Sequence, residues 1–569
     1  MSKTVTGAQI MWEALVAEGV EVCFGMPGGA ILPFYDAHAK YEYPVHHVLV
    51  THEQGGSHMA DGYARATGRV GVCIATSGPG ATNVMTGLAT ANMDSIPIVA
   101  LTGQVPNSLL GRDGFQEADI AGVSLPITKH NYLVTRVEDL GQAIKEAFYI
   151  ARTGRPGPVL VDVTKDVQNA VLEGFDYAAI EVDLPGYNPT KNAADPAAIA
   201  RAAKLINEAE RPVIISGQGT TMAGAEKELR QLAEKAQIPV STSLLGIGTI
   251  PSTHPLAISW GGMHGQAHTN FAWQECDVLV AIGARLDDRL TGAFDTFAPK
   301  AKIVHIDIDP AEMGKNLNID TPVVGDALMT LRELIPQVEA NEHPDWIEQI
   351  NDWKTEGAER DLLAQEMETL HAPYIMRSLW HATNEGDATV VTDVGQHQMW
   401  EAQYFPHTKE RSLLTSGGLG TMGFALPAAI GAQMGKPEEE VWVVAGDGGF
   451  QMTMIEMKTV MEQRLPIKIA LINNSFLGMV QQWQDVFYEK RYSGTPLHNP
   501  DFVKLADAYG IPGKVVDEVS DVVPTIQEAQ ETDGPYFIEF RVPAEHVYPM
   551  VPAGKSNSEM IRRAATEQE

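Results

Sequence analysis

Two polar side chains at the ends of apolar runs, Asp447 and Asn474, give the sequence its strongest chemical signal. Asp447 stands in Gly446-Asp447-Gly448 directly after the run VWVVA, and Asn474 closes the next run, IKIALINN. If these runs are adjacent parallel strands joined by a helix, their carboxyl ends bring the carboxylate and the amide together. Such oxygen ligands suit Mg²⁺, which commonly bridges to phosphate oxygens. The pair predicts a Mg²⁺ and diphosphate site rather than a capping Asp in a plain strand-turn-helix.

The glycines around Asp447 support this interpretation. Gly446, Gly448 and Gly449 let the backbone approach a ligand closely, and the N-terminus of the next helix offers free N–H groups to a diphosphate. The segment between Asp447 and Asn474 is predicted to be helical. Its expected apolar face carries Met452, Ile455 and Met457.

A competing motif lies upstream, where residues 418–423 spell G-x-G-x-x-G before the helical stretch FALPAAIGAQM. This pattern is also a dinucleotide-binding fingerprint. We reject that interpretation because the preceding run, RSLLTS, is short and polar. The first acidic residue at the end of a following strand is Asp447, which belongs to the better specified site.

The elements that must position these residues form a regular pattern. Short Val- and Ile-rich runs, such as VGVCIA, PVLVDV, PVIISG, VLVAIGA, KIVHIDI and TVVTDVG, alternate with helical stretches. Such runs are typical of buried parallel strands. The pattern breaks at residues 170–195 and 337–372, which predicts three doubly wound α/β domains at 1–180, 190–340 and 365–569. The first and third differ too much in sequence for a repeat to be claimed.

Composition limits the partners. The chain has 569 residues with 41 Lys and Arg against 73 Asp and Glu, a net charge of −32. This charge argues against nucleic acid or an anionic membrane as partner. There is no signal or transmembrane run, and Cys23, Cys73 and Cys276 lack metal-ligand spacing. We expect a soluble cytoplasmic protein with reduced core thiols.

Further motifs identify a family. The chain resembles, nearly end to end, the catalytic large subunits of the acetohydroxyacid synthases (acetolactate synthases) of the thiamine-diphosphate enzyme superfamily. The motifs that carry the resemblance are PGGA (27–30), HEQGG (52–56), SGPGATN (77–83), FQE (115–117), TKHNYLV (128–134), GRPGPVLVDV (154–163), GMHG (262–265), RLDDR (285–289), HIDIDPAE (305–312), GQHQMW (395–400) and GMVQQWQ (478–484).

The resemblance implies thiamine diphosphate (ThDP) and Mg²⁺ as cofactors. The metal ligands would be Asp447, Asn474 and the backbone carbonyl of Phe476. Glu53, between a strand and a helix, would hydrogen-bond the pyrimidine ring; taken alone, it would be a solvent-facing helix cap. The other residues implied for ThDP are Gln396 and His397 at the diphosphate, Met422 beneath the two rings, and Gly420, Gly446, Gly448, Gly449 and Met479. Gly449 replaces the Ser that relatives often carry.

The substrate-binding residues are implied in the same way. Gly29 would place a backbone group near the reacting centre, and Phe115, Gln116 and Lys165 would line the substrate approach. Met479, Val480 and Trp483 would shape the pocket for the second keto acid. Taken alone, Trp483 would be a core aromatic.

FAD is implied in the middle domain, although the net reaction is not a redox one. Leu286 replaces the usual Phe of its RFDDR-type motif. The implied residues are Arg155, Gly217, Gly219, Ser243, Leu244, Met263, His264, Gly283, Arg285, Asp287, Asp307, Ile308, Asp326 and Ala327. Taken from the residues alone, these are loop positions of a doubly wound domain.

The implied function is that of a transferase in the biosynthesis of valine, leucine and isoleucine. It would decarboxylate pyruvate and join the remaining fragment to pyruvate or 2-ketobutyrate, giving 2-acetolactate or 2-aceto-2-hydroxybutyrate. A homodimer or tetramer and a small regulatory subunit are also expected. The alternatives are a catabolic acetolactate synthase, a glyoxylate carboligase, a pyruvate oxidase and a catalytically silent flavin- or nucleotide-binding regulatory protein.

Overall fold

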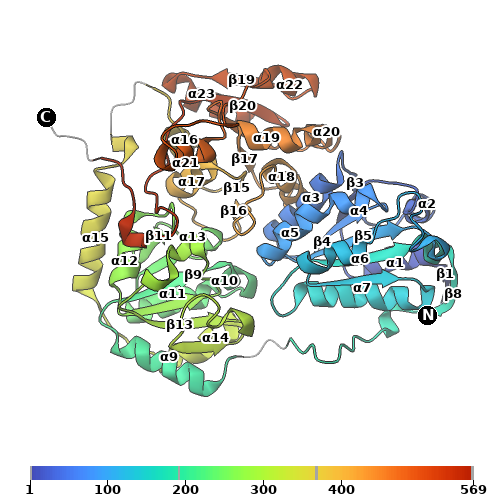
Figure 1. Cartoon of the computed structure of the whole chain (residues 1–569), viewed down its shortest axis with the longest axis horizontal. Helices are drawn as coiled ribbons and strands as arrows, with labels where there is room; N and C mark the ends of the chain where they lie inside the picture. Colours follow the sequence, from blue (N-terminus) through green and yellow to red (C-terminus); the bar gives the residue numbers. More distant parts are fainter. Residues whose placement is uncertain (1–2, 190–192, 365–368, 565–569) are drawn as a thin grey trace.

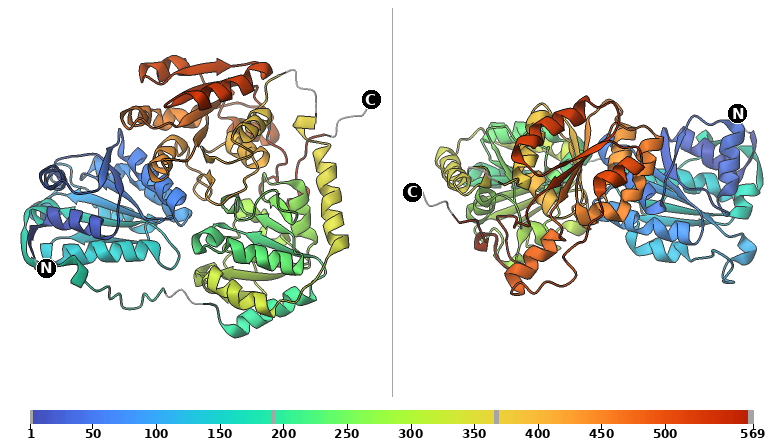
Figure 2. Two further views of the ribbon diagram at one scale, coloured as in Figure 1. Left: turned by 180° about the vertical axis from the view of Figure 1, so that it is seen from behind. Right: turned by 90° about the horizontal axis from the view of Figure 1, so that it is seen from above.

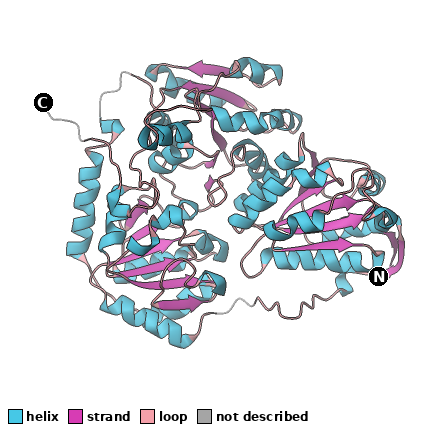
Figure 3. Ribbon diagram, viewed as in Figure 1, coloured by secondary structure: helices cyan, strands magenta, loops and turns pink. Residues whose placement is uncertain are grey.

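The computed structural model describes residues 3–189, 193–364 and 369–564, which form three α/β units (Figure 1). The first unit is blue to cyan, the middle unit green and the third orange to red. Each has a central sheet with helices on both faces (Figure 3). The predicted starts of the second and third domains, residues 190 and 365, lie outside the described residues.

The first unit contains a six-stranded sheet in the order β3-β2-β4-β5-β7-β6, in which all neighbours are parallel. Its strands are β2 (Val22–Gly25), β3 (His46–Leu49), β4 (Gly71–Ala75), β5 (Ile98–Gln104), β6 (His130–Val134) and β7 (Val159–Thr164). Its helices are α1 (Gly7–Ala17), α2 (Leu32–Tyr41), α3 (Glu53–Thr67), α4 (Pro79–Asn83), α5 (Met85–Met93), α6 (Ile120–Ser124), α7 (Val137–Arg152) and α8 (Lys165–Asn169). Beside them, β1 (Lys3–Thr6) pairs antiparallel with β8 (Val171–Phe175).

The third unit has a sheet in the order β16-β15-β17-β18-β20-β19, also parallel throughout. Its strands are β15 (Thr389–Thr392), β16 (Leu413–Leu414), β17 (Val441–Gly446), β18 (Lys468–Asn473), β19 (Gly513–Val516) and β20 (Tyr536–Arg541). Its helices are α16 (Ala372–Ala382), α17 (Gln396–Tyr404), α18 (Ala425–Gly435), α19 (Asp447–Thr453), α20 (Met457–Glu462), α21 (Gly478–Phe487), α22 (Phe502–Ala508) and α23 (Val519–Glu531). Counted along the chain, the six strands follow the same order as those of the first sheet, a likeness of topology that the sequence alone did not show.

The middle unit has a different order, β11-β10-β9-β12-β13-β14. Its strands are β9 (Pro212–Ser216), β10 (Val240–Thr242), β11 (Ala257–Trp260), β12 (Val278–Ile282), β13 (Lys302–Asp307) and β14 (Thr321–Val324). Its helices are α9 (Pro196–Glu208), α10 (Gln218–Ala223), α11 (Glu226–Ala236), α12 (Ala267–Glu275), α13 (Asp288–Thr291), α14 (Ala327–Leu334) and α15 (Pro344–Ala358). This is the order of dinucleotide-binding sheets, whose ligands lie where the strand order reverses, here between β9 and β12.

Two helices join the first and third units. A Cβ atom on Gly62 of α3 would lie 2.0 Å from the carbonyl oxygen of Ala428 in α18, and one on Gly431 would lie 1.8 Å from that of Met59. The helix backbones are therefore in direct contact, and residues of both units share one apolar core. Figure 2 shows from behind and from above that the blue first unit and the orange third unit lie side by side.

The predicted strands are confirmed, but the helix between Asp447 and Asn474 is not continuous. A 3-10 turn at Met454–Glu456 separates α19 from α20. Met452, predicted on the buried face, is 55% exposed. The turn directs the buried carboxylate of Glu456 toward the first unit, where it accepts hydrogen bonds from the backbone N–H groups of Thr51 and His52.

The three cysteines are free and buried, as expected of core thiols. Among the described residues, no helix is long and apolar enough to cross a membrane.

Candidate functional site

Asp447 and the residues after β18 lie at one edge of the third sheet. Strands β17 and β18 are neighbours, with Gly446 opposite Ile472, as the sequence predicted. Asp447 is 2% exposed, and its Oδ2 accepts a 2.7 Å hydrogen bond from the Asn499 side chain. Burial raises the pKa of Asp447 to about 6. A buried carboxylate without a cationic partner is costly, so this position favours a bound cation.

Asn474 lies beside this carboxylate edge. Its Nδ2 donates to the Oε1 of Gln396 at 3.2 Å, and its Oδ1 accepts from the backbone N–H of Phe476 at 3.1 Å. Among the described residues, no group of three His, Cys, Asp or Glu side chains forms a metal site. A metal here would need one carboxylate, an amide oxygen and backbone carbonyls, a set that suits Mg²⁺.

His397 presents an unsatisfied polar atom at the same edge. The residue is 6% exposed, and its Nε2 has no hydrogen-bond partner within the described chain. Burial lowers its pKa to about 3, so the ring is neutral. A Cβ atom on Gly446 would lie 2.7 Å from the Nδ1 of His397. A side chain at this position of the Gly446-Asp447-Gly448 motif would therefore collide with the ring.

Asp393, which the sequence analysis did not single out, organises the neighbouring loop. It follows β15, is 1% exposed and accepts hydrogen bonds from the backbone N–H groups of Gly423 and Ala425 at 3.0 and 3.3 Å. The loop between β16 and α18 that it holds carries the half-buried Met422. A Cβ atom on Gly449 would lie 2.4 Å from the carboxylate of Asp393. The glycine that replaces the Ser often found in relatives therefore leaves room for this carboxylate.

The predicted first-unit residues gather at the carboxyl edge of its sheet. Gly29 follows β2, Glu53 opens α3 after β3, and Lys165 opens α8 after β7. Glu53 is 8% exposed, and its Oε2 accepts a 2.9 Å hydrogen bond from the side chain of Asn83.

The loop after β5 completes this edge. Gln116 adopts a φ of 59°, and Phe115 is 89% exposed. A Cβ atom on Gly78 would lie 2.8 Å from the carbonyl oxygen of Gln116, so the loop closes onto the end of β4.

A cavity of about 880 Å³ lies at the carboxyl edge of the middle sheet. Every middle-unit residue predicted for a flavin lines it except Gly217, as does Arg155 of the first unit. Gly217 and Gly219 also allow the backbone after β9 to approach the backbone after β12, because a Cβ atom on either would lie within 2.6 Å of Gly283. The cavity therefore occupies the point where the strand order reverses.

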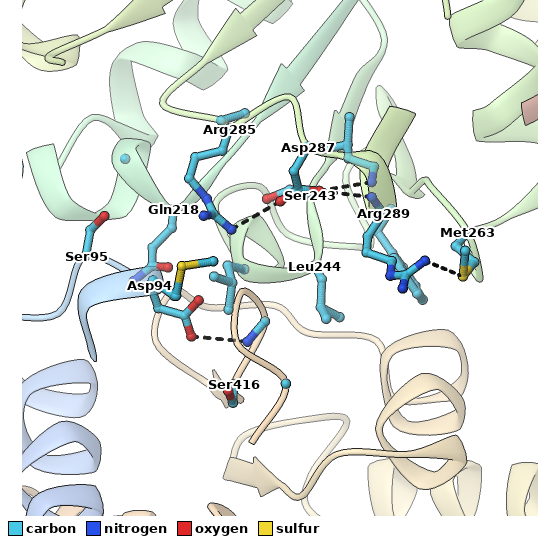
Figure 4. Close-up of a pocket in the computed structure, with 18 of the residues that line it drawn as sticks. Asp94, Ser95, Gln218, Ser243, Leu244, Met263, Arg285, Asp287, Arg289 and Ser416 are labelled. Atoms are coloured by element: carbon cyan, nitrogen blue, oxygen red, sulfur yellow. Dashed lines mark hydrogen bonds and ion pairs between the residues drawn. The ribbon is translucent and has the colours of Figure 1, made fainter. Parts of the chain in front are cut away.

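Charged side chains line this cavity, and some of them pair with one another (Figure 4). Arg285 donates to Asp287 at 3.1 Å, and burial raises the pKa of Asp287. Burial also raises the pKa of Asp307 to about 6. Arg155 donates to Ser95, Asp309 and Glu312.

The same cavity extends to the third unit. Gly420 and the α21 residues Met479, Val480 and Trp483 line it, and the Arg289 guanidinium lies 5.9 Å from the Trp483 ring centre. The cavity-lining residues missed as site candidates include Met93, Asp94, Ser95, Trp260, Arg289 and Ser416. Arg289 was visible in RLDDR, whereas Asp94 and Ser416 lie in segments without a motif.

The predicted residues do not all meet within one chain. The residues predicted to bind ThDP or substrate that do not line this cavity include Gly29, Glu53, Phe115, Gln116 and Lys165 of the first unit and Gln396, His397, Met422, Asp447 and Asn474 of the third. The first-unit edge is therefore separate from the cavity, with Phe115 projecting into solvent.

Comparisons with known proteins agree with the three units. Residues 5–123, 199–334 and 393–540 match the N-terminal TPP binding domain, the central domain and the C-terminal TPP binding domain of thiamine pyrophosphate enzymes. The chain is 49% identical to the acetolactate synthase large subunit of Corynebacterium glutamicum, over 98% of this chain and 90% of that protein. It is 46% identical to a probable acetolactate synthase large subunit of Methanocaldococcus jannaschii, over 99% of this chain and 96% of that protein. It is 48% identical to an acetolactate synthase of Mycobacterium leprae, over 98% and 90%.

Proposed function

Because the chain belongs to the acetolactate synthase large subunits of the thiamine pyrophosphate enzyme family, we propose that it makes acetohydroxy acids for branched-chain amino acid biosynthesis. It decarboxylates pyruvate and joins the remaining fragment to pyruvate or 2-ketobutyrate. The observation that carries this proposal is near full-length kinship combined with an intact set of Glu53, Asp447 and Asn474 at sheet edges.

The third-unit edge fits a Mg²⁺-diphosphate group. The buried carboxylate of Asp447 and the amide of Asn474, with the backbone carbonyl of Phe476, would hold the metal. The unpartnered Nε2 of His397 would bind a diphosphate oxygen. The Nε2 of Gln396 donates here to Gln482 and to the carbonyl of Glu545, so it would join the diphosphate only by exchanging one of these partners. When bound, ThDP supplies a carbon nucleophile and an electron sink for the decarboxylation.

The chain's own residues supply proton control and position. Glu53 is proposed to share a proton with the pyrimidine ring through a hydrogen bond. Asn83 positions the Glu53 side chain by donating a 2.9 Å hydrogen bond to its Oε2. Met422 would support the ring system from a loop that Asp393 anchors through Gly423. A closed site would exclude water, which protects the intermediate two-carbon fragment from protonation.

The cavity between α21 and Arg289 would receive the second keto acid. The Arg289 guanidinium provides a cation for its carboxylate, and the Trp483 ring provides an apolar wall for its alkyl group. Such a wall discriminates one methylene by roughly 1–3 kcal/mol.

The middle unit fits FAD. Its strand order is that of dinucleotide-binding sheets, its glycines bring the ends of β9 and β12 together, and Arg285 and Asp307 offer partners for phosphate and ribose. This fit favours the biosynthetic enzyme over the catabolic acetolactate synthase, which is expected to lack the flavin.

We also propose a homodimer as the minimal working unit. In one chain the Glu53 edge of the first unit and the Asp447 edge of the third line no common cavity among those described, which supports a site completed by a second copy. The relatives named as large subunits support a small regulatory subunit as a further partner.

Replacing Glu53 by Gln tests the proposal. Loss of the proton-holding group should lower kcat by at least about 100-fold, with an unchanged melting temperature. The matched control is Glu173→Gln on the exposed β8. Full activity in Glu53→Gln would contradict the assigned role.

A further inference from the structure

A second cavity, of about 310 Å³, lies between the middle unit, α15 and the segment 545–563 that follows β20. Residues of β10, β11 and α12 form one wall, and residues of α15, α16 and α17 form the others. Figure 1 shows α15 running along the outside of the molecule from the middle unit toward the third. Trp260 lines both this cavity and the larger one, so the two cavities share this residue in their walls.

The lining of this cavity is basic, although the whole chain carries a net charge of −32. Its cationic side chains are Lys354, Arg360, Arg377, Arg562 and Arg563, and the one carboxylate in its described lining is Asp361. Such a concentration of one charge in a recess attracts the opposite charge.

Two of these cations are already paired. Glu356 of α15 accepts from Arg360 at 3.0 Å and from Arg562 at 2.7 Å. Because one carboxylate pairs with two guanidinium groups, these three side chains together carry a net positive charge.

Three cations have no such partner. Within the described residues, Lys354, Arg377 and Arg563 form no ion pair with a carboxylate. Arg377 lies 5.4 Å from the centre of the Trp380 ring, and Arg563 lies 5.5 Å from that of Tyr548. Aromatic faces orient these guanidinium groups and leave their N–H donors available.

Two polar ring atoms in the same wall also lack partners. His268 is 7% exposed and Trp260 is 5% exposed, and neither the Nε2 of His268 nor the Nε1 of Trp260 has a hydrogen-bond partner in the described chain. Buried polar groups in proteins are normally hydrogen-bonded, so the unpaired Trp260 N–H beside a basic cavity indicates a missing acceptor. The Nε2 of a neutral His268 donates or accepts according to the tautomer of the ring.

The wall of this cavity also contacts the proposed active site. His546, which lines the cavity, lies 2.6 Å from the Oδ2 of Asp485 on α21. The adjacent Val547 exchanges hydrogen bonds of 2.8 and 2.9 Å with Gln482 of the same helix. A ligand bound at this wall would therefore contact a segment that is hydrogen-bonded to α21, the helix that carries Trp483.

We propose that this cavity binds a small polyanion, either a phosphate compound or a polycarboxylate. Its volume is at the lower end of ligand pockets, which suits a compact molecule. Several cations converging on one space favour a ligand with more than one negative charge, because each charge-assisted hydrogen bond then satisfies a separate donor. The site does not depend on the proposed carboligation.

Calorimetric titration of the holoenzyme with inorganic phosphate and, separately, citrate tests the site. ThDP, Mg²⁺ and FAD are kept saturating so that the cofactor sites are filled. The variant is Lys354→Gln with Arg377→Gln, and the matched control is Lys204→Gln on the exposed face of α9. The wild type and the control should bind one of the anions with equal affinity, and the double variant should bind it at least tenfold more weakly.

Hydrogen–deuterium exchange locates the bound anion independently of affinity and activity. Exchange should slow in residues 344–361 and 545–551 of the wild type and not in the double variant. Binding of phosphate alone identifies the phosphate class, and binding of citrate alone identifies the polycarboxylate class. Equal binding by wild type and double variant, no binding of either anion, or protection confined to residues 283–289 would overturn the proposal. Lys354 is exposed, so the single variant Lys354→Gln replaces the double one if the latter melts early.

Discussion

The Oδ1 of Asp94, in the first unit, accepts a 2.7 Å hydrogen bond from the backbone N–H of Gly418 in the third. The Oδ2 accepts from Gly417 at 3.1 Å and from the Arg65 guanidinium at 2.8 Å. The Arg65 Nη1 donates in turn to the carbonyl of Thr415. A buried ion pair on α3 and α5 thus holds the loop that leads to Met422.

Replacing Asp94 by Ala should loosen this loop and destabilise the chain. Removing one partner of a buried ion pair costs up to about 3–5 kcal/mol. We expect a loss below that range here, because Asp61 still pairs with Arg65. We expect a lower melting temperature and weaker ThDP retention, measured by thermal unfolding and by equilibrium dialysis. The control, Asp139→Ala on the exposed face of α7, should change neither. An Asp94→Ala protein with wild-type melting and ThDP retention would show that the contact does not position the loop.

Replacing Asp447 by Asn should weaken metal-dependent cofactor binding. The substitution removes the single carboxylate among the proposed Mg²⁺ ligands and keeps its shape. The Mg²⁺ concentration needed for half-maximal ThDP retention should rise at least about 100-fold, measured by titration of the metal-free protein. Asp517→Asn, an exposed site, serves as the control. Retention with an unchanged Mg²⁺ requirement would exclude Asp447 as a ligand.

Replacing Trp483 by Leu should reduce the preference for 2-ketobutyrate over pyruvate as the second substrate. The smaller side chain leaves the extra methylene with less contact, which corresponds to roughly 1–3 kcal/mol, or a change of up to about 100-fold. Competition between the two keto acids, followed by chromatography of the products, gives the ratio. Phe294→Leu, outside the cavity, should leave it unchanged. An unaltered ratio in Trp483→Leu would place the specificity elsewhere.

His58 should make the chain sensitive to acid. The residue is fully buried, packs edge-on against Phe424, and both ring nitrogens lack partners in the described structure. Burial lowers its pKa to about 3, so the unfolded chain, with a pKa near 6.5, binds the proton first. Its contribution to stability is therefore present above pH 6.5 and is lost as the pH falls toward 3. Between pH 7 and 5 the loss is about 2 kcal/mol.

Comparing melting temperatures at pH 7 and pH 5 checks this sign. His58→Leu should show a smaller fall than the wild type, and the control His381→Leu, on an exposed position, should show the same fall. A fall in His58→Leu as large as that of the wild type would mean that the ring is not buried in its neutral form.

The sequence predicted the parts of the fold that depend on local pattern. Asp447 and Asn474 were identified because each directly follows a Val- and Ile-rich run, and β17 and β18 are indeed neighbours. Met452 was placed wrongly because the break at Met454–Glu456 depends on a contact with His52, far away in the chain. The shared strand order of the first and third units was also not visible, since topology survives when side chains have changed.

The site residues that escaped prediction are those placed by tertiary packing. Asp94 lies between a helix and a strand without a motif, and its contacts with Gly417 and Gly418 join residues more than 300 positions apart in the chain. Asp393 follows an evident strand, and an acidic residue at a strand end was the signal that would have identified it. The roles of Glu53, Gln396 and the residues assigned to the flavin remain predictions from the resemblance.

Product analysis of the purified chain tests the central claim most directly. The chain is incubated with ThDP, Mg²⁺, pyruvate and 2-ketobutyrate, with and without FAD. We predict 2-acetolactate and 2-aceto-2-hydroxybutyrate, formed only when FAD is present. Formation of acetaldehyde or acetate alone, with or without an added small subunit, would contradict the assignment as an acetohydroxy acid synthase.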